Sequence, residues 1–143
     1  MQPSVWDAAD GESGRARLTM STRREAEAVI VTLVGELDFD SAEMLGELIN
    51  TVFSEHAARV LVDCAGLEFC DSSGLNVLLR ARLAARAAGV ELALVGVPVA
   101  LERVLDLTGT TTAFVRYAGV EEALAGRRGD DAQNGDGQAS AEG

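Results

Sequence analysis

The chain has 143 residues, of which 48% are hydrophobic, enough for one ordinary domain with a buried core. Its formal net charge of -11 argues against direct contact with nucleic acid, because a phosphate backbone attracts basic surfaces. The sequence contains arginine but no lysine, which excludes P-loop enzymes, protein kinases and Schiff-base enzymes, since each of these needs that amine.

Both ends are predicted to lie outside a single domain that spans residues 17–125. Residues 1–16 have the composition of a flexible segment and residues 126–143 that of a disordered acidic tail, because neither carries a periodic apolar pattern. No stretch reaches the roughly 20 apolar residues of a membrane span, and no secretory signal is recognisable. We therefore expect a cytoplasmic protein with no membrane partner.

The first predicted elements are two strands and a helix. Leu18 and Met20 alternate with polar residues, and residues 29–34 are apolar and rich in β-branched side chains, so each segment is expected to form a strand. The second strand is predicted to end at Gly35, and Ser41 is predicted to cap the helix that follows. Apolar residues recur along that helix at the spacing of one helical face: Leu45, Leu48, Ile49, Val52 and Phe53.

The middle of the chain alternates between strands and helices. Residues 60–62 predict a short buried strand, followed by a turn at residues 64–66. A second helix is predicted over residues 73–88, with Gly89 as its left-handed stop. Residues 90–95, which are apolar except for Glu91, are typical of a central strand.

The closing elements complete an α/β pattern. Pro98 suits the first turn of a third helix that ends near Gly109, and residues 114–117 and 119–124 predict a last strand and a short helix. The order β-β-α-β-α-β-α-β-α predicts an α/β fold, with a mixed, mostly parallel sheet packed against about four helices.

The most informative local feature is the sequence CDSSGL at residues 70–75, between an apolar approach and an amphipathic helix. Ser72 or Ser73 is expected at the helix N-terminus, where free backbone N–H groups and the helix dipole accommodate a phosphate. A phosphorylated Ser72 would place a charge of about -1.5 to -2 beside Asp71, where a docked partner would meet it. The plainer alternative is that these polar residues only cap the helix.

A serine hydrolase is an enzymatic alternative, because a serine on a strand-to-helix turn resembles the nucleophile elbow G-x-S-x-G. Cys70 stands where that motif needs its first glycine, and the sole histidine, His56, precedes Ser72 in the chain. We therefore expect no enzymatic activity.

A metal site is also considered. Asp38, Asp63 and Asp71 could gather at the carboxyl ends of strands and hold magnesium as in a receiver domain, but the lysine of that site is missing. Cys64 and Cys70 lack the second pair or the nearby histidine that zinc requires, so they are expected to be buried. No metal and no cofactor are predicted.

Several segments follow one another at a recognisable spacing: VTLVGELD at residues 31–38, LVD at 61–63, DSSGL at 71–75 and LTG at 107–109. Together they resemble the STAS family of anti-sigma factor antagonists (anti-anti-sigma factors), and the resemblance extends from about Leu18 to Leu124. It implies a STAS fold for the whole predicted domain. Cys70 replaces the family's usual aliphatic residue, and both ends are extended.

The resemblance implies a mechanism of partner switching. In that family the serine after the aspartate of D-S-[ST]-G-L is the phosphoacceptor, which corresponds to Ser72, with Ser73 as a neighbour. The unphosphorylated protein is then expected to bind an anti-sigma factor, a GHKL-type serine kinase, and so to free a sigma factor. That kinase would phosphorylate Ser72 and release the complex, and a PP2C-type phosphatase would reset it. The implied role is indirect transcription regulation in a stress response.

The expected partner-binding surface combines one rim with the outer face of the 73–88 helix. The rim comprises Asp38, Asp71, Ser72, Ser73, Gly74 and Asn76. Asn76 stands where many family members have glycine, and we expect its larger side chain to narrow the set of kinases that dock. Two other functions stay open, a STAS scaffold module that is never phosphorylated and a small serine hydrolase.

Overall fold

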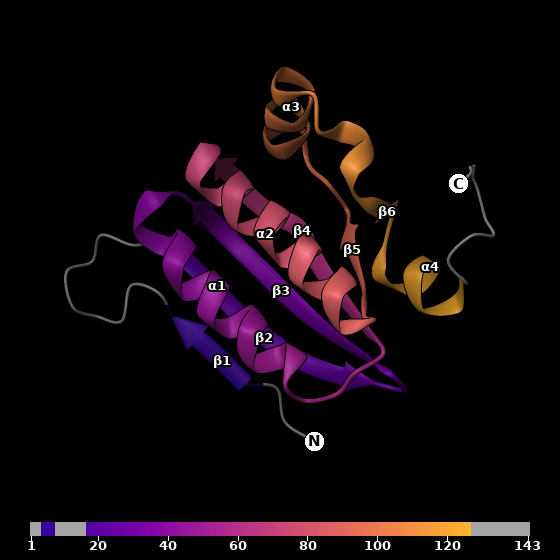
Figure 1. Cartoon of the computed structure of the whole chain (residues 1–143). Helices are drawn as coiled ribbons and strands as arrows, with labels where there is room; N and C mark the ends of the chain where they lie inside the picture. The colour runs from indigo at the N-terminus through magenta and orange to yellow at the C-terminus, as the bar shows by residue number, and fades with distance from the viewer. Residues whose placement is uncertain (1–3, 8–16, 127–143) are drawn as a thin grey trace.

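The structure is a computed structural model that describes residues 4–7 and 17–126. It contains one six-stranded sheet whose strands lie side by side in chain order (Figure 1). The strands are β1 (Ser4–Asp7), β2 (Leu18–Glu25), β3 (Ala28–Leu37), β4 (Arg59–Cys70), β5 (Glu91–Val95) and β6 (Val115–Tyr117). The helices are α1 (Phe39–Phe53), α2 (Ser72–Ala88), α3 (Val99–Thr108), the 3₁₀ helix η1 (Thr111–Ala113) and α4 (Val120–Ala125).

The sheet is antiparallel at its N-terminal side and parallel over the rest. β1 and β2, and β2 and β3, pair antiparallel, whereas the pairs from β3 to β6 are parallel. This confirms the α/β class, the mostly parallel sheet and the predicted order of elements from β2 onward. β1 lies within the segment predicted to be flexible, and the remaining residues of the two predicted ends (1–3, 8–16 and 127–143) lie outside the described residues.

The two faces of the sheet carry cores of different size. On β3, Val29, Val31 and Leu33 point into the larger core, which side chains from α1, α2 and α3 complete. The alternate residues Ala28 and Ile30 belong to a smaller core that α4 covers. The period of two along the strand therefore assigns three helices to one face and one short helix to the other.

The prediction that the second strand ends at Gly35 is wrong, because β3 continues to Leu37. Irregularities in the β3–β4 register on either side of Gly35 absorb the distortion without ending the pairing. Gly35 has a φ of +116°, and a Cβ there would lie 1.9 Å from the carbonyl oxygen of Arg17. The N–H of the next residue, Glu36, donates a hydrogen bond to the same carbonyl oxygen over 3.1 Å. Glycine thus permits the close approach of β2.

The predicted turn at residues 64–66 is also wrong. β4 runs without interruption from Arg59 to Cys70, and its last residue still pairs with Leu37 of β3. The polar and small residues in this stretch belong to the strand because pairing with β3 resumes after each irregularity in the register. α2 begins one residue earlier than predicted, at Ser72, and Pro98 precedes α3 as its N-cap residue.

Within the described residues, no helix is both long enough and apolar enough to cross a membrane.

Gly35→Ala tests the close approach of β2 and β3. We expect the free energy of unfolding to fall by about 3 kcal/mol or more, because the added Cβ meets backbone atoms and the φ angle is unfavourable for alanine. Guanidinium titration followed by circular dichroism measures the loss. The control is Gly109→Ala at the end of α3, where φ is +72° but the Cβ meets no atom within 4 Å, so about 1 kcal/mol is expected. Equal losses in the two variants would contradict this account of Gly35.

Candidate functional site

The parallel pairing of β3 and β4 brings two aspartates to one edge of the sheet. The last residues of the two strands, Leu37 and Cys70, are register partners, and the N–H of Asp71 donates to the carbonyl of Leu37 over 3.2 Å. Asp38 and Asp71 directly follow these strands and are the N-cap residues of α1 and α2. We call this region, with Ser72, the capped edge.

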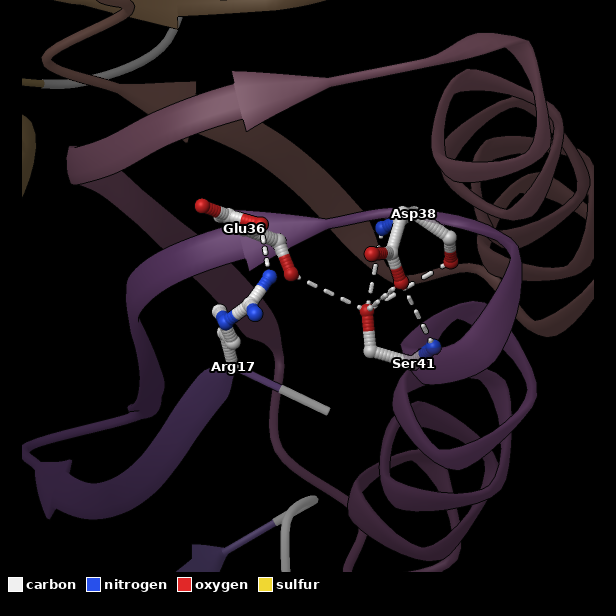
Figure 2. A network of polar contacts seen from close by, with 4 residues as sticks. All are labelled: Arg17, Glu36, Asp38 and Ser41. Carbon is white, nitrogen blue, oxygen red and sulfur yellow. Dashed lines mark hydrogen bonds and ion pairs between the residues drawn. The ribbon is translucent and has the colours of Figure 1, made fainter. Parts of the chain in front are cut away.

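Asp38 is held in a capping box at the start of α1 (Figure 2). Its carboxylate Oδ1 accepts the N–H of Ser41 over 3.1 Å, and its own N–H donates to Ser41 Oγ over 3.0 Å. The Ser41 hydroxyl lies 3.1 Å from the carbonyl oxygen of Glu36 and 3.2 Å from Asp38 Oδ1, and it can donate to one of them at a time. Ser41 is fully buried, so these contacts satisfy its polar group inside the protein.

This network corrects the predicted role of Ser41. The N-cap residue is Asp38, and Ser41 occupies the third position of the helix, where it completes the reciprocal half of the capping box. An acidic residue followed three positions later by serine, just before an apolar helical run, was a signal that could have located this box from the sequence. Arg17 adds an exposed ion pair with Glu36 over 3.4 Å (Figure 2), which contributes little by itself in water.

The start of α2 presents Ser72 to solvent. Asp71 Oδ1 accepts the N–H of Gly74 over 3.1 Å, which fixes the first turn, and Ser72 is the first residue inside the helix. Ser72 and Asn76 are exposed on the same helical face, whereas Ser73 is half-buried. The first backbone N–H groups of a helix lack partners within it and lie at the positive end of its dipole. A phosphate on Ser72 is therefore compatible with the local backbone.

Gly74 sets the distance between α2 and the sheet. It is buried, and a Cβ at this position would lie 2.6 Å from Leu37 Cγ and 3.0 Å from the Leu37 carbonyl oxygen. Only glycine lets the first turn of α2 rest on the end of β3 at this distance. Gly74 thus positions Ser72, and it offers no side chain of its own to a partner.

The third candidate aspartate has a different role. Asp63 lies within β4, before the bulged stretch, and its carboxylate accepts the N–H of Ala65 over 3.1 Å. In the part of the chain that the structure describes, no three side chains of His, Cys, Asp or Glu are grouped as metal ligands. The structure thus brings Asp38 and Asp71 to one edge and leaves Asp63 inside the sheet.

His56 lies far along the fold from the capped edge. It follows the C-terminal end of α1 with a φ of +62°, while Ser72 lies at the N-terminal end of α2. Both helices follow parallel strands and therefore run in the same direction, so the histidine and the serine are at opposite ends of this helical layer. The geometry does not assemble the serine–histidine pair that a hydrolase needs.

Both cysteines are buried, as predicted from the sequence. Burial raises the pKa of the Cys70 thiol to about 12, and the neighbouring carboxylate of Asp71 adds to the effect. Burial likewise raises the pKa of the Cys64 thiol to about 12, with a smaller contribution from Asp63. At neutral pH both thiols are protonated, which removes Cys70 as a nucleophile despite its place beside the capped edge.

Comparison with known proteins identifies the family. Residues 20–122 match the family model described as "Mlab, STAS domain". The chain belongs to the STAS-domain family. This confirms the resemblance drawn from the DSSGL and GELD segments.

Solved structures share the STAS fold with this chain. An anti-sigma factor antagonist from Mycobacterium paratuberculosis superposes with a TM-score of 0.69 at 24% identity, covering 76% of this chain and 92% of its own. The Bacillus cell fate determinant SpoIIAA in its phosphorylated form gives 0.61 at 24% identity, covering 74% and 96%. A sulfate transporter family protein from Wolinella succinogenes gives 0.63 at 20% identity, covering 83% and 93%.

Ser41→Ala tests the capping box. We expect a loss of about 1–3 kcal/mol in the free energy of unfolding, because the partly buried N–H of Asp38 loses its acceptor. Chemical denaturation provides the measurement. Ser54→Ala is the matched control, since that exposed hydroxyl only donates to the Thr51 carbonyl at the end of α1 and should cost about 0.5 kcal/mol or less. Similar losses would show that Ser41 is not a special position.

Thiol alkylation tests the burial of the cysteines. With pKa values near 12, against 9.0 for a free thiol, the native thiols should react with iodoacetamide at pH 8 about a thousandfold more slowly than in the urea-unfolded chain. Mass spectrometry of Cys64→Ala and Cys70→Ala resolves the two sites individually. Native and unfolded rates within a few fold of each other would contradict this environment.

Proposed function

We propose that this STAS-domain protein is an anti-sigma factor antagonist that is switched by phosphorylation of Ser72. In its unphosphorylated form it binds a GHKL-type anti-sigma factor in the cytoplasm and so releases a sigma factor. Phosphorylation by that same partner ends the complex, and a PP2C-type phosphatase restores the active form. The protein itself carries out no reaction and acts on transcription, in a stress response, only through its partner.

The observation that carries the proposal is the exposure of Ser72 at the first position of a helix fixed to the sheet. Asp71 caps that helix, and Gly74 seats it on Leu37. The serine hydroxyl is accessible to a kinase, while the backbone around it is held on two sides. A phosphate is then expected to leave the fold intact and to change only what a partner meets.

The charge of the phosphate determines how strongly it would weaken partner binding. A phosphate adds a charge of about -1.5 to -2 next to Asp71 and near Asp38. When a partner covers this edge, uncompensated charge must be desolvated, which costs several kcal/mol. About 1.4 kcal/mol already corresponds to a tenfold change in affinity, so one phosphate is sufficient to release the complex.

We propose that the partner covers the capped edge together with the outer face of α2. Asn76 is exposed one turn after Ser72, and Ser73 is half-buried beside it. Asn76 is therefore the side chain best placed to discriminate between related kinases. Asp38 contributes mainly through its position, because its carboxylate is already engaged by Ser41.

A second candidate function is a constitutive STAS module in a larger assembly. The same fold occurs in the Wolinella chain described as a sulfate transporter family protein. In that case Asp71 and Ser72 serve only as the cap and first turn of α2, and no phosphate forms.

Affinity capture from the native host's lysate separates the two candidates. The baits are full-length Ser72→Ala, Ser72→Asp and, as a charge control away from the edge, Ser54→Asp at the end of α1. We expect Ser72→Ala and Ser54→Asp to retain a GHKL-type ATPase and Ser72→Asp to lose it by at least about tenfold, as measured by quantitative mass spectrometry.

Incubation of the captured ATPase with wild-type protein and Mg·ATP should then phosphorylate Ser72, with Ser72→Ala as the blank. Retention of the same proteins by all three baits, without phosphate on Ser72, would favour the constitutive module.

A further inference from the structure

The outer faces of α1 and α2 form a continuous surface with a groove between them. The two helices lie side by side on the same face of the sheet (Figure 1). Small and apolar side chains form the floor of the groove: Ala42, Gly46, Ile49, Val77, Ala81 and Ala84. Such a floor lets another helix approach closely.

The two sides of this groove carry opposite charges. α1 contributes three exposed carboxylates, Asp40, Glu43 and Glu47, and α2 contributes the exposed guanidinium of Arg80. None of these four side chains takes part in an ion pair between described residues. The surface therefore presents both halves of a possible ion pair, one on each helix.

The relative height of the two helices fixes which charges could meet. A Cβ at Gly46 would lie 3.8 Å from Val77 Cγ1, so these two residues are level across the groove. With a rise of about 1.5 Å per residue, Glu47 lies about 1.5 Å above this level and Arg80 about 4.5 Å above it. Glu47 and Arg80 are thus within about 3 Å of the same height, on helices that run in the same direction.

We propose that this surface is a self-complementary interface through which two copies of the chain form a dimer. A two-fold axis that runs along the helices, in the plane between the copies, places α1 of one copy on α2 of the other at equal heights. Glu47 of each copy then faces Arg80 of the other, and Asn76 lies close to the opposing Glu43. Each dimer contains the Glu47–Arg80 pair twice.

Charge selects this arrangement over its alternative. A two-fold axis perpendicular to the helices would place α1 on α1 and α2 on α2. Asp40, Glu43 and Glu47 would then face their own counterparts, and Arg80 would face Arg80. Like charges brought together across an interface cost several kcal/mol, so the crossed pairing is favoured over the perpendicular one.

Two exposed apolar side chains lie at the ends of the same surface. Phe39, at the start of α1, is 77% exposed, and Leu83, one turn beyond Arg80 on α2, is 59% exposed. In the dimer Phe39 covers the first turn of the opposing α2, and Leu83 covers the last turns of the opposing α1. Burial of two such side chains per copy supplies apolar area that charge pairing alone does not.

The dimer does not depend on the proposed function, but the two would interact. Both use the outer face of α2, so a copy bound there excludes an anti-sigma partner. The dimer is then a form of the protein that cannot bind the anti-sigma partner. The fraction of the protein in this form rises with the total protein concentration.

Analytical ultracentrifugation of full-length variants tests the interface. We expect a concentration-dependent dimer for the wild type, and a loss of at least about tenfold in the association constant for Arg80→Glu and for Glu47→Arg, since each removes both ion pairs. The double variant Glu47→Arg/Arg80→Glu should restore association, because the same pairs form with exchanged signs.

Controls separate this pairing from general charge effects. Arg103→Glu on α3 and Glu121→Arg on α4 make the same changes in net charge at exposed positions away from the groove and should leave association unchanged. Thermal unfolding verifies that every variant is folded. A wild type that stays monomeric up to millimolar concentration, or a double variant that fails to recover, would overturn the proposal. Neither result bears on phosphorylation of Ser72.

Discussion

The parallel pairing of β3 with β4 is the constraint on which the candidate site depends. Because Leu37 and Cys70 are register partners, the two strands end at the same height, and Asp38 and Asp71 start the next helices side by side. A slip of one residue in this register would separate the two caps and turn the apolar side chains of β4 to the wrong face. The bulges near Gly35 preserve this alignment over a long strand pair.

Two glycines allow close contacts around that strand pair, one within the sheet and one between the sheet and α2. Gly35 admits the carbonyl of Arg17, which directly precedes β2, and Gly74 admits the Leu37 side chain of β3 beneath α2. In both places a methyl group would overlap atoms of a neighbouring segment. Ser72, directly after the Asp71 cap, is consequently held at a defined point while it stays exposed to solvent.

Much of the architecture was predictable because apolar periodicity reports burial directly. The stripe from Leu45 to Val52 marks α1 because every residue of that stripe is buried. The end of β3 was missed because Gly35 is a common strand terminator, and only the approach of the Arg17 carbonyl, just before β2, shows why the strand continues through it. Ser41 was misassigned for a similar reason. A serine near a helix start usually caps it, and the acidic residue three positions earlier, Asp38, was the signal that would have placed the cap correctly.

The same short segment determines both the fold and what the surface presents, but with different residues. Gly74, Leu75 and Leu78 point inward and admit little change, whereas Ser72 and Asn76 point outward from the same two turns of helix. Substitutions at the outward positions can accumulate after gene duplication without loss of the domain. Related copies of such a protein can therefore present different surfaces on nearly identical cores.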